Sequence, residues 1–183
     1  EIMPSLVGSE MCIRDRNGQV RPAVRLAAMR RYNIGRPATS NERNHMQREI
    51  MTSIPFLSQP SAAAENTEED LAVAQDLKDT LDAHRNGCVG MAANMIGVNK
   101  SIIVVAAGPF QFAMVNPVIT KKSGEYKTEE GCLSLDGVRP CIRYEEIEVD
   151  YLDSNFKPQH GKYSGFTAQI IQHEVDHCNG VVI

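Results

Sequence analysis

Apolar and polar positions repeat with helical spacing in the middle of the chain. Between residues 67 and 85 the apolar side chains recur at steps of three and four residues, which gives one stripe formed by Leu71, Ala74, Leu77 and Leu81. Thr67 stands where a side-chain oxygen can accept from the free N–H groups of a helix start, and three acidic residues follow it at the positive end of the helix dipole. The pair at 86–87, Asn-Gly, is typical of a helix end. The pattern predicts a helix over residues 67–85.

Short apolar and β-branched runs after this helix predict strands. They lie at residues 101–106, 112–120 and 146–152, with a shorter piece at 125–128, and Gly, Pro, Asn and Asp separate them. Residues 165–167 open a second helix that runs to Cys178 and ends at an Asn-Gly pair. A helix, several strands and a second helix are typical of an α+β fold with mainly antiparallel sheet.

The first 45 residues lack this patterning. Their apolar positions show neither sustained helical spacing nor strand alternation, and they hold eight arginines but no lysine, whereas every lysine lies from Lys78 onward. The stretch SLVGSEMCIRDR at residues 5–16 resembles a translated sequencing adapter, and an arginine-rich organellar transit peptide is the biological alternative. We expect residues 1–45 to be a non-native or disordered extension, with Met46 as the true start.

The other end of the chain suggests an incomplete domain. Only six residues follow His177, and they hold no pattern of a closing helix or strand. We expect residues 46–183 to form one domain that is truncated at its C-terminus.

Composition narrows the class of protein. With 183 residues, of which 42% are hydrophobic, the chain is long enough to bury one sizeable core. A net charge of -4 gives no general attraction to nucleic acid or anionic lipid, and no apolar run approaches the roughly 18–20 residues that cross a bilayer. Five cysteines, an odd number, without a signal peptide argue against a secreted disulfide framework. We therefore expect a cytoplasmic protein with reduced thiols that contacts neither membrane nor nucleic acid directly.

The strongest chemical signal is the sequence HEVDH at residues 173–177. Two histidines four positions apart lie on one face of a helix, one turn from each other, so both imidazoles can reach one metal ion. Glu174 lies beside them, where it can take a proton from a metal-bound water without being a ligand itself. Asp176 is either a partner that orients a ligand histidine or an exposed helix carboxylate.

A third ligand has to come from upstream, because no His, Glu or Asp follows His177 and the one cysteine there, Cys178, closes the helix. Cys132, in the sequence EGCLS at residues 130–134, lies at the expected junction of a strand and a loop. Cys141 is the competing candidate, and either cysteine could instead be a small buried apolar residue. Two imidazoles and one thiolate leave a fourth position open for water, as a catalytic site requires.

These motifs together resemble those of the peptide deformylases. EGCLS at 130–134 and QHEVDH at 172–177 are similar to two of the three signature motifs of that family. The third is normally a glycine-hydrophobic-glycine-hydrophobic-alanine-alanine run that ends in glutamine, and residues 89–97, VGMAANMIG, match it in order and position. The resemblance covers residues from about 46 to 183 and implies a peptide deformylase-like catalytic domain, with antiparallel sheet around the helix that carries HEVDH.

The resemblance also implies roles for individual residues. Cys132, His173 and His177 would bind one divalent metal ion, natively Fe²⁺ and replaceable by Zn²⁺, Ni²⁺ or Co²⁺. Glu174 would be the general base, and the N–H of Leu133 would hold the oxyanion. The reaction would be hydrolysis of the formyl group of an N-formylmethionyl peptide.

Further residues are candidates for substrate contacts. Gly90, Gly131 and Arg139 would contact the substrate backbone and its carboxyl side, as the resemblance implies. An apolar pocket would accept the methionine side chain, with a lining of Val89, Phe166 and Ile170, although ordinary core positions are an equal interpretation of those three. The partner would be a formylated peptide or a nascent chain, with transient contact to the ribosome.

The chain departs from the family pattern at two positions. The first motif glycine is Cys88, and the motif glutamine is Met95. In the family that glutamine amide donates to the oxyanion, whereas a thioether has no donor. Asn94 carries an amide one position early and would replace the glutamine only if the backbone turned differently. Three functions remain open: a slow deformylase, a hydrolase of another formyl- or acyl-amide, and a metal-binding relative without activity.

Overall fold

The computed structural model describes residues 46–183, so the predicted extension at residues 1–45 lies outside the described part of the chain. The elements are, in chain order, α1 (Ile54–Leu57), α2 (Glu68–Ala83), β1 (Gly90–Ala92), the 3-10 helix η1 (Ala93–Ile96), β2 (Ile102–Ala107), β3 (Phe110–Cys132), β4 (Leu135–Leu152), β5 (Pro158–Ser164) and α3 (Gly165–Cys178). Within residues 46–183, no helix is long and apolar enough to cross a membrane.

The strands form one sheet in the order β1-β2-β3-β4-β5, and every neighbouring pair is antiparallel. This confirms the predicted α+β class with mainly antiparallel pairing. One isolated parallel bridge, between Ala62 and Lys100, ties the segment before α2 to the loop before β2.

Helix α2 follows the prediction closely. The side chain of Thr67 accepts a hydrogen bond from the N–H of Asp70 at 3.2 Å, and three acidic residues occupy the first turn. The helix ends at Ala83, before the Asn-Gly pair that was expected to stop it. The buried face is also shifted, because Leu71 is 37% exposed and Val73 takes its place beside Leu77.

The strands are longer than the apolar runs that predicted them. Residues 112–120 and 125–128 are parts of the single strand β3, and residues 146–152 are the last part of β4. The sequence analysis missed β1 and β5. Strand β5 has the sequence PQHGKYS, is mostly exposed and has almost no apolar residues. It is formed by its antiparallel pairing with β4, in which Leu152 lies opposite Pro158 and Glu146 lies opposite Ser164.

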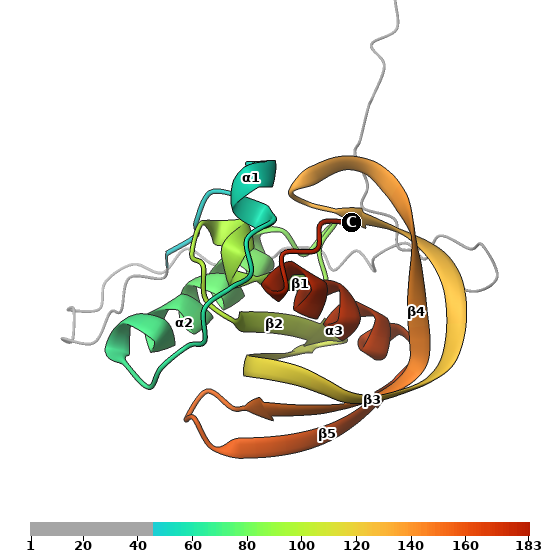
Figure 1. The fold of residues 1–183 in the computed structure, drawn as a ribbon. Coiled ribbons are helices and arrows are strands. Elements are labelled where there is room, and N and C mark those ends of the chain that lie inside the picture. Colours follow the sequence, from blue (N-terminus) through green and yellow to red (C-terminus); the bar gives the residue numbers. More distant parts are fainter. Residues whose placement is uncertain (1–45) are drawn as a thin grey trace, which may run out of the picture.

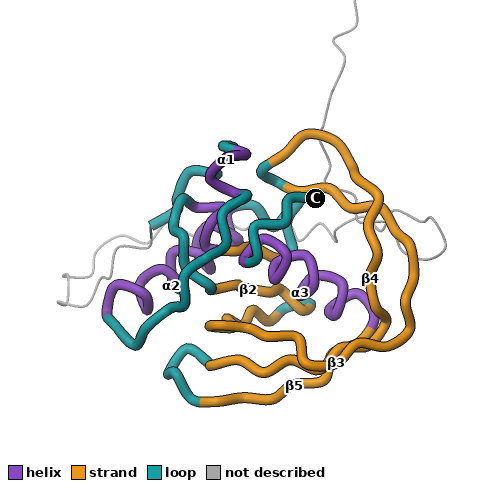
Figure 2. Tube along the Cα trace, in the orientation of Figure 1, coloured by secondary structure: helices purple, strands orange, loops and turns teal. Residues whose placement is uncertain are grey.

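Irregular pairing bends the long hairpin of β3 and β4. The register shifts between Val115 and Val118, where Asn116 adopts a φ of 50°, and again after Ile119. Such β-bulges raise the local twist of a strand. As a result the two strands sweep around α3 (Figure 1), and the helix lies inside their curve when the chain is traced as a tube (Figure 2).

Helix α3 is buried on nearly all sides. It contacts β1, β2, β4 and β5, and its apolar residues join a core that includes Leu77, Met91, Ile103 and Ile171, each 0% exposed. Unusually, its buried side chains also include a set of polar ones, namely Gln169, Gln172, His173, Glu174 and His177. Buried polar groups need hydrogen-bond partners, so these side chains of α3 are candidates for a functional site.

We expect Thr67→Ala to lower the free energy of unfolding by about 1 kcal/mol, because it removes the side-chain acceptor that caps α2. Urea denaturation followed by circular dichroism measures this change. Thr52→Ala, at an exposed loop position, is the matched control and should change stability little. Equal stability of the two variants would contradict the capping role.

Candidate metal centre and active site

Cys132, His173 and His177 come together in the interior. Their ligand atoms all lie within 4.8 Å of one another, and all three side chains are buried. The Sγ of Cys132 is 3.2 Å from the Nε2 of His177, and the two imidazole rings are 5.0 Å apart at 71°. The histidines are one turn apart on α3, and Cys132 reaches them from the last residue of β3.

This set of donors fits a divalent first-row metal ion. One thiolate and two imidazoles are ligands that zinc and its neighbours accept, and three protein ligands leave a position open. The N–H of Ser134 donates to the Sγ of Cys132 at 3.4 Å, so the turn after β3 helps to hold the sulfur in place.

Cys141, the other candidate ligand, lies elsewhere. It is half-buried on β4 and faces Thr128 in the strand register, and it is not a member of the cluster that residues 46–183 form around the two histidines. Burial, together with the nearby Glu130 carboxylate, raises the pKa of Cys141 to about 12. That disfavours the thiolate that a metal ion needs.

The carboxylate of Glu130 holds one of the histidines. It accepts a hydrogen bond from the Nδ1 of His173 at 2.8 Å, and a fork of two from Arg143 at 2.8 and 2.9 Å. Gln169 adds a fourth donor at 2.9 Å. Burial alone would raise the pKa of Glu130, but the hydrogen bonds from His173 and Arg143 outweigh it and hold that pKa at about 2. A metal-ligating histidine is commonly oriented by a carboxylate in this way.

Asp176 belongs to the same network. It pairs with the second side of the Arg143 guanidinium at 2.7 Å and is 28% exposed. Of the two interpretations open for Asp176, the structure supports a partner rather than a free surface carboxylate. It acts on His173 through Arg143 and Glu130, however, and not by direct contact.

The two imidazoles differ in their protonation. Burial lowers the pKa of His173, but hydrogen bonds with Cys132 and Glu130 outweigh this and raise it to about 10. Burial and the positive charge of His173 lower the pKa of His177 to about 3. A cation that binds both rings therefore displaces a proton from His173.

Glu174 lies beside this cluster and is 3% exposed. Burial raises its pKa to about 7 despite the opposing charge of His173, which is suitable for a group that exchanges protons near neutral pH. Its Oε2 atom is buried and has no hydrogen-bond partner among residues 46–183. A Cβ on Gly90 would lie 2.6 Å from the other oxygen, so β1 can approach Glu174 this closely only with glycine at that position.

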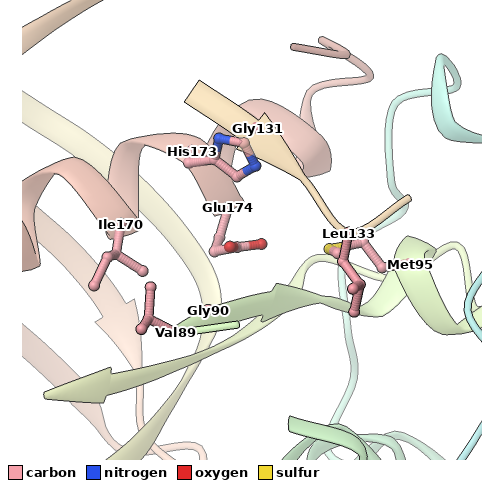
Figure 3. A pocket seen from close by; sticks show the side chains of 8 residues that line it. All are labelled: Val89, Gly90, Met95, Gly131, Leu133, Ile170, His173 and Glu174. Atoms are coloured by element: carbon pink, nitrogen blue, oxygen red, sulfur yellow. The ribbon is translucent and has the colours of Figure 1, made fainter. Parts of the chain in front are cut away.

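A pocket opens at Glu174. Its lining consists of Val89, Gly90, Met95, Gly131, Leu133, Ile170, His173 and Glu174. Figure 3 shows Ile170 and Val89 on one side of the Glu174 carboxylate, and Leu133 and Met95 on the other. Residues from all three sequence motifs thus converge on one pocket.

Two predicted substrate residues do not line this pocket. Phe166 is 49% exposed in the first turn of α3. Arg139 is half-buried on β4 and faces Glu130 in the strand register. One nitrogen of its guanidinium group is buried without a hydrogen-bond partner in the described chain.

Met95 and Asn94 have separate contacts. The Sδ of Met95 accepts from the N–H of Ala92 at 3.5 Å, and its side chain is 1% exposed. The amide of Asn94 donates to the carbonyl of His177 at 2.7 Å. Asn94 therefore does not take the place of the motif glutamine, because its donor is already bound at the end of α3.

The sequence analysis missed the roles of Glu130, Arg143, Gln169 and Asn94. Glu130 carried a usable signal, since residues two apart on a strand share a face and Glu130 stands two before Cys132. Arg143 and Gln169 carried none, because their meeting with Glu130 depends on the β3–β4 register and on the position of α3.

Comparison with known proteins agrees with this site. The family model described as polypeptide deformylase matches residues 48–183. A peptide deformylase of Clostridium beijerinckii is 53% identical over 138 residues, which cover 75% of this chain and 100% of the relative. That of Pelotomaculum thermopropionicum is 45% identical over 100 residues, covering 54% of this chain and 64% of the relative.

A solved structure is also similar. The class I type b peptide deformylase of Acinetobacter baumannii, with Met-Ala-Ser bound, superposes with a TM-score of 0.68 at 30% identity and covers 75% of this chain and 96% of its own. The match of the family model over most of the described residues, together with the 53% identity to a full-length relative, shows the family. The chain belongs to the polypeptide deformylase family.

Proposed function

We propose that this chain is a metal-dependent hydrolase that removes the formyl group from N-formylmethionyl peptides. The observation that carries the proposal is the convergence of Glu174 with Cys132, His173 and His177 beside one pocket. A purely structural metal site has no use for a buried carboxylate with a free oxygen next to its ligands.

Cys132, His173 and His177 would hold one divalent metal ion. When bound, the ion supplies Lewis-acid activation of water and of the scissile carbonyl group. Fe²⁺ is the ion that the family resemblance implies, and Zn²⁺, Ni²⁺ or Co²⁺ suit the same donors. Glu130 holds the His173 ring by its Nδ1, so the other ring nitrogen would be free to bind the ion.

Glu174 acts as the general base and then as the general acid. With a pKa raised to about 7 by burial, its carboxylate takes a proton from the attacking water and returns it to the amine that leaves. One water is consumed, the carbon–nitrogen bond breaks, and formate and a free α-amine are the products.

The developing oxyanion needs fixed donors, and this chain has fewer than its family pattern. The N–H of Leu133, at the pocket edge, is one donor. Met95 offers none. Loss of one oxyanion donor costs about 100- to 1,000-fold in turnover, so we expect this enzyme to be slower than it would be with glutamine.

The lining of the pocket suits a peptide with an apolar first residue. Val89 and Ile170 would contact the methionine side chain, and the main chains of Gly90 and Gly131 would align the peptide. Phe166 and Arg139, outside the lining, would contact it only beyond the pocket. The similar Acinetobacter structure holds Met-Ala-Ser, which supports a short peptide as the product. Binding of nascent chains at the ribosome stays a prediction.

We expect the full chain, loaded with Ni²⁺ or Fe²⁺ without oxygen, to release formate from formyl-Met-Ala-Ser. Glu174→Gln should reduce the rate by at least about 100-fold and leave metal content unchanged, because the general base is lost while the ligands remain. A coupled formate dehydrogenase assay measures the rate, and elemental analysis measures the metal.

The variant Met95→Gln is measured in the same formate-release assay, beside the unmodified chain. A restored amide donor should raise turnover, by up to about 100- to 1,000-fold. Activity in Met95→Gln alone would mean that the fold and the site are competent but that the natural substrate is another formyl- or acyl-amide. Absence of formate from both metal-loaded proteins would contradict the proposed reaction.

We expect Cys132→Ala to lose its metal ion and Cys141→Ala to keep it. Cys132 supplies the only thiolate within the cluster formed by the described residues, whereas Cys141 lies outside it. Elemental analysis after dialysis distinguishes the two variants, and Cys141→Ala is the matched control. Normal metal content in Cys132→Ala would refute the ligand assignment.

We expect Gly90→Ala to reduce kcat/KM by about 100-fold at normal metal content. The added Cβ would lie 2.6 Å from both the Oε1 of Glu174 and the Cγ2 of Ile170, and displacement of a catalytic group by about 1 Å has an effect of this size. Steady-state kinetics measure the loss. Gly108→Ala is the control: its Cβ meets nothing within 4 Å, so the variant should retain activity, although the left-handed φ of 63° should cost it some stability. Equal kinetics in both variants would contradict the steric argument.

A further inference from the structure

Asn94 joins two parts of the site that are far apart in sequence. It lies in η1, is 0% exposed, and its Nδ2 donates to the carbonyl of His177 at 2.7 Å across 83 positions. The acceptor is therefore the main chain of a residue that we propose as a metal ligand.

The last turn of α3 depends on partners outside the helix. The final carbonyls of a helix have no intrahelical donors. The carbonyl of His177 accepts two hydrogen bonds, one from the N–H of Gly180 at 3.1 Å and one from the Nδ2 of Asn94 at 2.7 Å. The carbonyl of Cys178 accepts one from the N–H of Ser61 at 2.8 Å. Asn94 is thus a side chain that fixes the main chain of His177 from outside α3.

The two histidines are held in different ways. The ring of His173 is oriented by its Nδ1 bond to Glu130. The Nδ1 of His177 is buried and has no hydrogen-bond partner within residues 46–183. Ligand histidines usually owe their orientation to a second bond from the ring. Because the Nδ1 of His177 lacks one from the described chain, the position of its main chain, together with the contact between its Nε2 and Cys132, sets where the ring lies.

The residue after Asn94 cannot share this task. Met95 accepts from the N–H of Ala92, the last residue of β1, and has no donor for the end of α3. The two neighbouring side chains therefore face different parts of the molecule: the thioether of Met95 lines the pocket, and the amide of Asn94 binds the end of α3.

We propose that Asn94 is a positioning residue that holds the metal ligand His177 in place. The proposal rests on the ligand assignment made for the proposed function. Without the amide, the last turn of α3 would lose its tie to η1, and His177 would meet the ion in a poorer geometry. Loss of a group that orients a metal ligand typically lowers metal affinity by about 10- to 100-fold, and we expect a loss of that size here.

The test measures Co²⁺ binding to the full chain, by competition with a chelator and by the visible absorption spectrum of the bound ion. Asn94→Leu keeps the approximate size of the side chain and removes the donor. Asn94→Asp keeps the shape and replaces the donating nitrogen with an oxygen. Both variants should bind Co²⁺ about 10- to 100-fold more weakly and show an altered ligand-field spectrum.

Asn116→Asp is the matched control. The Nδ2 of Asn116 also donates to a main-chain carbonyl, that of Ala64 at 2.9 Å, and aspartate tolerates its left-handed φ of 50°. This variant should lose stability but keep both the affinity for Co²⁺ and the spectrum. A purely structural role of Asn94 would make the variants at the two positions behave alike.

Two outcomes would overturn the proposal. One is unchanged Co²⁺ affinity and spectrum in a folded Asn94 variant. The other is failure of both Asn94 variants to fold, which would assign Asn94 to the fold as a whole. Cys132→Ala in the same titration separates this proposal from the proposed function, because Co²⁺ binding by that variant as tight as in the unmodified chain would remove the ligand assignment itself.

Discussion

The structure depends on one buried anion, the carboxylate of Glu130. It is 1% exposed and accepts four hydrogen bonds, two from Arg143 on β4 and one each from Gln169 and His173 on α3. Burial of a carboxylate costs several kcal/mol unless such partners offset it, so β3, β4 and α3 have to meet in one arrangement. That arrangement also fixes the His173 ring, so the contacts that order the fold also order the candidate metal centre.

The curved hairpin makes this meeting possible. Strand β3 runs on well beyond its pairing with β2 and stays paired with β4, and the bulge at Asn116 bends the two strands around α3. The end of β3 then carries Cys132 to the histidines. On the opposite side, β1 approaches so closely that only glycine fits at position 90 against Glu174. A carboxylate that is packed between β1 and its own helix has little freedom to move, which suits the proposed role of Glu174 as a group that takes up a proton and then returns it.

The 3-10 helix η1 carries Met95, one of the two departures from the motifs of the family. Met95 presents a thioether to the pocket, and Asn94 ties the same turn to the end of α3. In the proposed mechanism, Met95 would weaken the stabilisation of an oxyanion, whereas the proposed metal ligands are unchanged. A site that keeps its metal centre and general base but loses one donor is expected to retain the type of reaction while its rate falls.

The sequence by itself determined the elements with strong local patterns and the ligand candidates. The periodicity and caps of α2, the two histidines one turn apart on α3, and the three motifs are all properties of neighbouring residues, so they can be identified without a fold. Only the tertiary structure decided between Cys132 and Cys141, placed Arg143 and Gln169 on Glu130, and turned Asn94 away from the pocket. It also formed β5, which has almost no apolar pattern. These features depend on strand register and on the packing of α3 within the curved sheet, and contacts between residues tens of positions apart leave no periodic trace in the chain.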